Sequence, residues 1–320
     1  MSRNPTERSK ARVGLFAVQA LTLLLTAASL LGAHYRTRNL AAAPGGPRES
    51  PGSLLAGHGT RAARGWSPAV SFRLVDPRAW GRMAALDSAE LLTVLKLNRV
   101  DLRHARRTAL VVPDSIADEL AYAPFPASVP ELAPVPKFLA VSRRVQALAA
   151  YEHGRLVRWA PVSTGRAETP TDPGLFFTNW KSRRTISTEN PSWILDWYVN
   201  IIALKGVAFH EYELPGRPAS HGCIRLLEAD ARWLYAWADQ WVPGRGSEIK
   251  RWGTPVFVFG EFDYAHRAPW LDLPTDPAAG RVPAVELEQA LAPYLATLYE
   301  RSRPPVEQWL AQSGAAPSGS

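Results

Sequence analysis

One uncharged run of 21 residues, from 13 to 33, most constrains where the rest of the chain can fold. As a helix at 1.5 Å per residue it would be about 31 Å long, which matches the hydrocarbon core of a bilayer. Four basic residues precede the run, and the positive-inside rule places such a segment on the cytoplasmic side. We therefore expect residues 1–40 to be a cytoplasmic stub followed by a transmembrane or signal-anchor helix.

A buried core helix and a cleaved signal peptide are the two alternatives to a retained anchor for this run. A buried core helix of that length would usually carry a charged face, which this run lacks. The run also exceeds a typical signal-peptide core, although residues 41–43 (Ala-Ala-Ala) offer a cleavage site. A retained anchor and a cleaved signal both place the remaining chain in the cell envelope, outside the cytoplasm. As a retained anchor, residues 13–33 would tether the chain to the inner membrane.

Composition narrows the class of protein. The 320 residues predict about two domains, and 46% apolar with 21% charged residues is close to a globular average. This excludes a mainly disordered chain, a collagen-like repeat and a multi-span membrane protein. The net charge of +8 permits anionic partners such as wall polymers, lipid headgroups or nucleic acid, but it selects none of them.

Shifts in composition along the chain suggest its organisation. Pro, Gly, Ser and Ala without periodicity make residues 41–68 a flexible linker. We expect a small subdomain over 69–130, a catalytic domain over 131–264 and a helical extension with a disordered tail over 265–320.

The small subdomain has a recognisable order of elements. Leu91, Leu92 and Leu95 give a helical stripe that begins after a potential cap at Ser88, and residues 109–112 form a strand-like run. The helix, the sequence LNRVD, a spacer and the sequence LVVP together resemble the end of a LysM glycan-binding repeat. A structural subdomain without glycan binding is the alternative.

Short apolar runs dominate the region from 136 to 264, which indicates a β-dominated α+β fold. The expected strands lie at 137–142, 145–154, 156–165, 175–178, 193–198, 207–210 and 255–259, with a hairpin turn at 151–154. One helix is expected over 228–241, and another over 285–300 with a kink or break at Pro293.

Cys223 is the only cysteine, which excludes an intrachain disulfide and a Cys-rich zinc site. It lies in the sequence Ser-His-Gly-Cys, between an expected strand and an expected helix. A free thiol is only slightly ionised at neutral pH, so a nucleophilic cysteine needs a base nearby. His210 ends the strand-like run VAFH, and a Pro/Gly-rich loop can bring Cys223 back to it. A buried structural thiol is the alternative.

The neighbours of Cys223 suggest further roles. His221 is two residues away and shares a face with the thiol in an extended backbone, although a structural hydrogen bond is an equal alternative. Gly222 would leave room for a substrate, and the N–H groups of Gly222 and Cys223 would form an oxyanion hole. Arg225 would hold a substrate carboxylate or pin the loop to an acidic residue. Trp193, with Trp197 and Tyr198, would line a substrate groove or pack in the core.

These residues resemble the L,D-transpeptidase catalytic domain of the YkuD type over about 136–260. That family carries a His, a variable loop, Ser/Thr-His-Gly-Cys and a following Asn or Arg. Here they stand as His210, Ser220 to Cys223, and Arg225. The sequences PVSTG (161–165) and TPTDPG (169–174) resemble the family's strand end and turn.

The resemblance implies a β-sandwich-like domain with a helix after the catalytic cysteine, and acyl transfer on peptidoglycan stem peptides. Cys223 would be the nucleophile and His210 the general base, while His221, Arg225, Ser220 and Gly222 would shape the site. Glu211 stands where the family often has Gly. The change keeps the backbone carbonyl that can orient the imidazole, but it adds a carboxylate that can alter the choice of acceptor substrate or the pKa of the imidazole. The turn at 171–173 is longer than in the family.

Other functions stay open or are disfavoured. A thiol hydrolase acting on the same stems, an L,D-carboxypeptidase, would use the same residues, and a non-enzymatic wall-binding protein would need a degenerate site. No aromatic/basic recognition motif supports nucleic-acid binding. No nucleotide-binding glycine motif and no metal-spaced His/carboxylate cluster is present in the sequence, so no cofactor and no metal are expected. The chain is expected to be a monomer.

Overall fold

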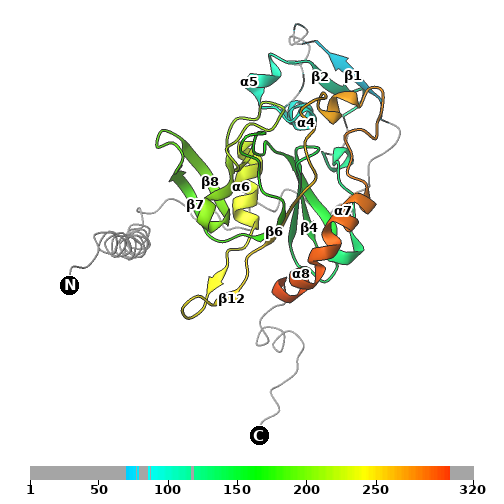
Figure 1. The fold of residues 1–320 in the computed structure, drawn as a ribbon. Helices are drawn as coiled ribbons and strands as arrows, with labels where there is room; N and C mark the ends of the chain where they lie inside the picture. Colours follow the sequence, from blue (N-terminus) through cyan, green and yellow to red (C-terminus); the bar gives the residue numbers. More distant parts are fainter. Residues whose placement is uncertain (1–69, 77, 79–85, 87, 117–118, 303–320) are drawn as a thin grey trace, which may run out of the picture. The chain divides into compact units, whose positions relative to one another are not determined.

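The computed structural model describes residues 70–302, apart from 77, 79–85, 87 and 117–118. The predicted membrane run, the linker over 41–68 and the predicted disordered tail lie outside the described residues (Figure 1). Within the described residues, every helix is too short or too polar to cross a bilayer.

A five-stranded sheet forms the centre of the described fold, in the order β5-β4-β3-β13-β6. Its strands are β3 (Phe138–Ser142), β4 (Ala147–Glu152), β5 (Arg155–Pro161), β6 (Gly174–Phe177) and β13 (Pro255–Phe259). All neighbours are antiparallel except β13 and β3, which run parallel. The predicted strands and the hairpin between β4 and β5 are therefore confirmed.

Both faces of this sheet are buried, because its central strands β4, β3 and β13 are almost entirely apolar and their apolar residues point to both sides. Phe138 and Ala140 face one core, whereas Leu139 and Val141 face a second core on the opposite side. Side chains of a strand alternate between faces, so a continuous apolar run predicts a strand covered on both sides.

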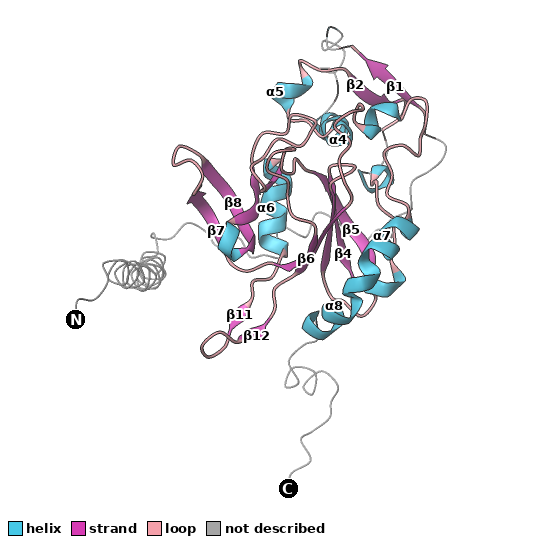
Figure 2. Ribbon diagram, in the orientation of Figure 1, coloured by secondary structure: helices cyan, strands magenta, loops and turns pink. Residues whose placement is uncertain are grey.

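A four-stranded sheet covers one face, in the order β10-β9-β8-β7. Its strands are β7 (Lys181–Ile186), β8 (Ile194–Ile202), β9 (Val207–Glu211) and β10 (Ile224–Leu226). The two sheets and helix α6 (Glu228–Trp237) share one apolar core, which gives the predicted sandwich with a helix after Cys223 (Figure 2). Strand β7 was not predicted, because its sequence KSRRTI is largely polar and lies at the sheet edge.

Helix α6 ends at Trp237, so the predicted extension to Trp241 is wrong. Ala238 leaves the helix with an extended ψ of 142°. The following residues bond to other segments instead, because the Asp239 N–H donates to Thr254 Oγ1 at 2.9 Å and the Trp241 N–H donates to the Asn179 carbonyl at 3.2 Å.

The C-terminal helices cover the other face of the central sheet (Figure 2). They are α7 (Ala284–Leu291) and α8 (Leu295–Ser302), separated by a 3-10 turn, η6 (Ala292–Tyr294), that contains Pro293. The predicted break at Pro293 is confirmed. Leu287, Leu291 and Leu298 all lie in the core beneath the sheet, together with Trp270 of η5 (Pro269–Asp272).

The described N-terminal elements contribute to the same core as the C-terminal helices. They are β1 (Phe72–Val75), α4 (Ser88–Asn98), α5 (Leu102–Ala105) and β2 (Leu110–Pro113), with β1 antiparallel to β2. Two 3-10 turns, η2 (Glu119–Tyr122) and η3 (Pro130–Leu132), lead into β3, and a third, η4 (Ala203–Lys205), links β8 to β9. A small hairpin of β11 (Val242–Pro243) and β12 (Ile249–Arg251) precedes β13.

The predicted domain boundaries and the LysM-like resemblance stay predictions.

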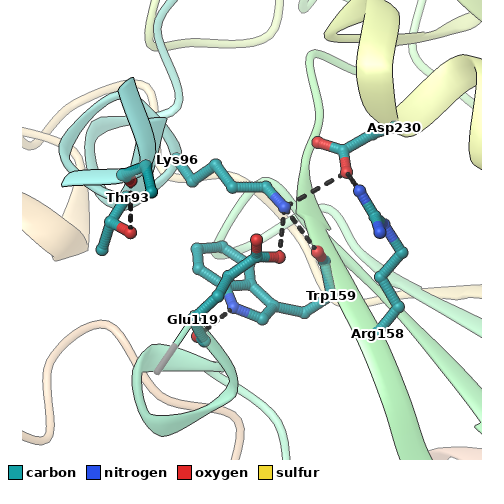
Figure 3. Close-up of polar contacts among 7 residues, drawn as sticks. Thr93, Lys96, Glu119, Arg158, Trp159 and Asp230 are labelled. Atoms are coloured by element: carbon teal, nitrogen blue, oxygen red, sulfur yellow. Dashed lines mark hydrogen bonds and ion pairs between the residues drawn. The ribbon is translucent and has the colours of Figure 1, made fainter. Parts of the chain in front are cut away.

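A buried lysine ties α4 to the sandwich (Figure 3). The Lys96 side chain is fully buried, and its ammonium pairs with Glu119 of η2 and lies 3.1 Å from Asp230 of α6. It also donates to the Trp159 carbonyl at 3.2 Å, and Arg158 binds the same Asp230 oxygen at 2.6 Å. A buried charge is tolerated when it is paired and hydrogen-bonded, as this one is.

Replacing Lys96 should therefore destabilise the fold. Lys96→Met leaves Asp230 and Glu119 short of a cation, and breaking a buried ion pair costs about 3–5 kcal/mol. Urea unfolding of the full chain would measure the loss. The control is Arg184→Ala, which removes an exposed ion pair with Asp196 and should change stability little. A smaller loss for Lys96→Met than for this control would contradict the assignment.

Candidate functional site

Parallel pairing of β9 with β10 brings His210 next to Arg225. In the register of the two strands, Arg225 lies opposite His210, and Ile224 lies opposite Phe209. Phe209 and Ile224 are fully buried in the core between the sheets. Because side chains alternate along a strand, His210 and Arg225 point to the opposite face, and Cys223, two residues before Arg225, follows them.

A cavity of about 620 Å³ opens over this face. His210, His221, Cys223 and Arg225 line one part of it. Its other walls come from β7, β8 and the segments that flank β7, β8 and β9. They carry four aromatic rings: Trp180, Trp193, Tyr198 and Tyr212. A concave site that combines aromatic and aliphatic walls with a few charged groups is typical of a ligand-binding pocket.

The His210 ring is held by the backbone of its neighbour. Its Nδ1 lies 2.9 Å from the Glu211 carbonyl, so Nδ1 carries the proton and donates it, and Nε2 is left as the acceptor. The expectation that a backbone carbonyl survives the change from Gly to Glu211 is confirmed. Burial lowers the pKa of His210 to about 4, against the smaller opposing effect of the Glu211 hydrogen bond, and the Arg225 charge lowers it further.

Cys223 is also kept uncharged. Burial raises the pKa of its thiol, although an Ala208 backbone hydrogen bond and the Arg225 charge lower it, and the Glu189 charge raises it. Its Sγ lies 3.7 Å from the Gly206 carbonyl. At neutral pH the cavity therefore holds a thiol and a neutral imidazole, and not a thiolate and an imidazolium.

Ser220 closes the tight turn that presents the cysteine. Its hydroxyl donates to the Cys223 carbonyl and accepts from the Gly222 N–H at 3.1 Å. Gly222 has a φ of +107°, a backbone conformation that side-chain-bearing residues rarely adopt. The glycine is thus needed by the turn itself, and its N–H, expected in an oxyanion hole, is engaged by Ser220.

Two threonines brace this turn from the neighbouring segment. Thr171 Oγ1 donates to the Gly222 carbonyl at 2.8 Å and accepts from the Gly165 N–H at 2.9 Å. Thr169 Oγ1 donates to the Ser220 carbonyl at 3.1 Å. Sequence reasoning placed these threonines in a turn but missed their bonds, which link segments about 50 residues apart.

His221 and Trp193 form one wall of the cavity. Their ring centroids are 5.0 Å apart, and both residues are half-buried. His221 Nδ1 is buried without a hydrogen-bond partner among the described residues. Tyr198 lines the cavity as well, whereas Trp197 packs against Arg183 and Tyr235 instead.

Arg225 is half-buried and rests on an aromatic ring. Its guanidinium lies 4.6 Å from the ring centroid of Tyr212, whose ring is also 5.8 Å from that of His210. Burial lowers the pKa of Arg225. Its backbone N–H and carbonyl both bond to Ser163 of the PVSTG segment. Tyr212 was missed by the sequence reasoning, because nothing local marks the loop residue that folds onto the site.

The family model of the YkuD L,D-transpeptidase catalytic domain matches residues 136–258. The resemblance to this family is thus confirmed for that segment. It includes His210, Cys223 and Arg225, and it ends within β13.

Several solved structures are also similar to the chain. One is an L,D-transpeptidase from Mycobacterium smegmatis, with 20% identity and a TM-score of 0.32, covering 39% of this chain and 59% of that chain. Another is an L,D-transpeptidase (Yku) from Stackebrandtia nassauensis, with 27% identity and a TM-score of 0.32, covering 40% of this chain and 57% of that chain. The match thus spans less than two thirds of either protein. No curated protein matches the chain.

The neutral state of the site predicts how Cys223 titrates. Because burial raises the thiol pKa, less thiolate is present at pH 7 than in an exposed cysteine, so alkylation by iodoacetamide should be slower. The rate should reach half its maximum at a higher pH in the folded chain than in the same chain unfolded in urea. A lower midpoint in the folded chain would contradict a neutral pair.

Proposed function

We propose that the chain is a peptidoglycan L,D-transpeptidase that works through a cysteine acyl-enzyme. One observation carries the proposal: Cys223, His210 and Arg225 share the cavity-facing side of β9 and β10, inside the segment that matches the YkuD family. Peptidoglycan stem peptides are the proposed substrates.

In the first half-reaction, Cys223 Sγ attacks the carbonyl carbon of the diamino acid at the third position of a tetrapeptide stem. His210 Nε2 takes the thiol proton, since the imidazole is neutral at physiological pH and its Nε2 lone pair is unprotonated. The amide bond to the fourth residue breaks, the proton passes to the leaving nitrogen, and D-Ala departs. A thioester remains on Cys223.

In the second half-reaction, an amine attacks the thioester carbon. His210 accepts the proton of this amine and returns one to the departing sulfur, which restores the starting state. An amine of a second stem peptide gives a crosslink, whereas water gives hydrolysis. The nucleophile and base are the same in both outcomes.

The remaining predicted site residues take supporting roles in this proposal. Arg225 binds a substrate carboxylate, because its guanidinium reaches the cavity from the same face as Cys223. His221 and Trp193 hold the substrate at the adjacent wall. Ser220 and Gly222 hold the turn that presents Cys223.

We further propose that the enzyme acts outside the cytoplasm, anchored by residues 13–33, as a monomer. The glycan-binding role implied by the LysM-like resemblance has less support. Within the LNRVD sequence that carries this resemblance, residues 97–100 are each at most 2% exposed, so their side chains are turned away from a glycan in solvent.

Product analysis tests the proposed function. Incubation of the full chain with a disaccharide-tetrapeptide should release D-Ala and yield a crosslinked dimer, and Cys223→Ala should yield neither because the nucleophile is gone. Free disaccharide-tripeptide without dimer would indicate the hydrolase. No product from the folded wild-type chain would contradict the proposal.

His210→Ala tests the base. Its alkylation by iodoacetamide at pH 7 should be slower than that of the wild type, because no imidazole takes the thiol proton. The two rates should converge at high pH, where the thiol ionises by itself. Superimposable profiles over the whole pH range would remove His210 as the base.

A further inference from the structure

The loop between the histidine and the cysteine, residues 212–219, is held by the turn between α4 and α5. The Asp101 N–H donates to the Leu214 carbonyl at 3.0 Å, and the Leu214 N–H donates to Asp101 Oδ2 at 2.9 Å. Leu214 is fully buried at this contact. Asp101 thus forms hydrogen bonds with both the N–H and the carbonyl of Leu214, a loop residue more than 100 positions away.

The next residues extend this contact. Val100 forms a β-bridge with Pro215, and the Gly216 N–H donates to the Arg99 carbonyl at 3.0 Å. Gly216 has a φ of +73°, and a Cβ added there would lie 3.1 Å from Val100 Cγ1. The two backbones therefore fit closely, and little displacement of the loop is tolerated.

The turn between α4 and α5 is itself held by contacts with other parts of the fold. The Arg99 side chain is buried, donates to the Val145 carbonyl at 3.0 Å and lies 4.8 Å from the ring centroid of Trp270. Asp101 Oδ1 accepts from the His104 N–H at 2.9 Å, which caps α5. Although burial raises the pKa of Asp101, hydrogen bonds from His104 and Leu214 outweigh this and lower it overall, so the group stays a carboxylate at neutral pH.

Tyr212 connects this contact to the chemistry. It lies two residues before Leu214, and its ring touches the guanidinium of Arg225 and the ring of His210. A loop that shifts at Leu214 therefore moves the ring on which Arg225 rests. Misplacing catalytic groups by about 1 Å can cost two orders of magnitude in rate.

We propose that Asp101 is a positioning residue, which holds Leu214 so that Tyr212 sets the placement of Arg225 and His210 at the thiol. The inference rests on the proposed function for its catalytic readout. The inference also gives the segment that contains α4 and α5 a role in this site that does not require glycan binding.

Asp101→Ser separates positioning from helix capping. Serine still caps a helix, so α5 is retained, but its side chain is too short to reach the Leu214 N–H as well. Acylation of Cys223 by the disaccharide-tetrapeptide should slow by about 10- to 100-fold. The matched control is Asp114→Ser in the same unit, where the carboxylate pairs with Ser71 and Arg73, and its rate should match the wild type.

A double-mutant cycle with Tyr212→Ala shows whether the effect passes through Tyr212. In the Tyr212→Ala background, adding Asp101→Ser should change the acylation rate by less than about twofold. If the two losses multiply instead, Asp101 acts on stability or by another route, and the proposal is overturned. If Asp101→Ser does not fold, Gly216→Ala disturbs the same contact from the loop side and should give the same non-additivity.

The alkylation of Cys223 separates a failure of this inference from a failure of the proposed function. Wild-type Cys223 should prefer anionic iodoacetate over iodoacetamide more strongly than a free cysteine does, because Arg225 lies on the same face, and Asp101→Ser should lose this preference. If the wild type forms no acyl-enzyme, the proposed function fails while this comparison still decides on Asp101. Unchanged preference and unchanged acylation in Asp101→Ser would overturn the inference.

Discussion

Three residues of β10 pair in parallel with β9, and this short ladder decides which side chains meet at the cavity. Phe209 and Ile224 face the core, so His210 and Arg225 must face the other way, with Cys223 beside them. A shift of one residue in this register would turn one of the two strands over, so that either the histidine or the arginine would face the core. The bracing of the Ser220–Cys223 turn by Thr169 and Thr171 keeps that register in place.

Burial of the site determines its electrostatics. Desolvation disfavours both the thiolate and the imidazolium, so the resting pair is neutral although Arg225 lies nearby. Proton transfer then accompanies the attack on a substrate. A neutral thiol is also better protected against oxidation, since thiols oxidise through their thiolate form.

Much of the fold followed from the sequence. Continuous apolar runs marked β3, β4 and β13, and Pro293 marked the break between the last helices. The sequence Ser-His-Gly-Cys and the strand-like run VAFH, which ends in His210, indicated the site. The polar edge strand β7 carried no such pattern. Tyr212 and Asp101 were missed for a different reason, because their roles depend on contacts across the fold that no local spacing records.

The central claim is that Cys223 carries an acyl group from a stem peptide. The most direct measurement is the intact mass of the full chain shortly after mixing with a disaccharide-tetrapeptide. The account predicts a mass increase equal to a disaccharide-tripeptide acyl group, located on Cys223 by peptide mapping and absent in Cys223→Ala. An unchanged mass while D-Ala is released by both forms would contradict it.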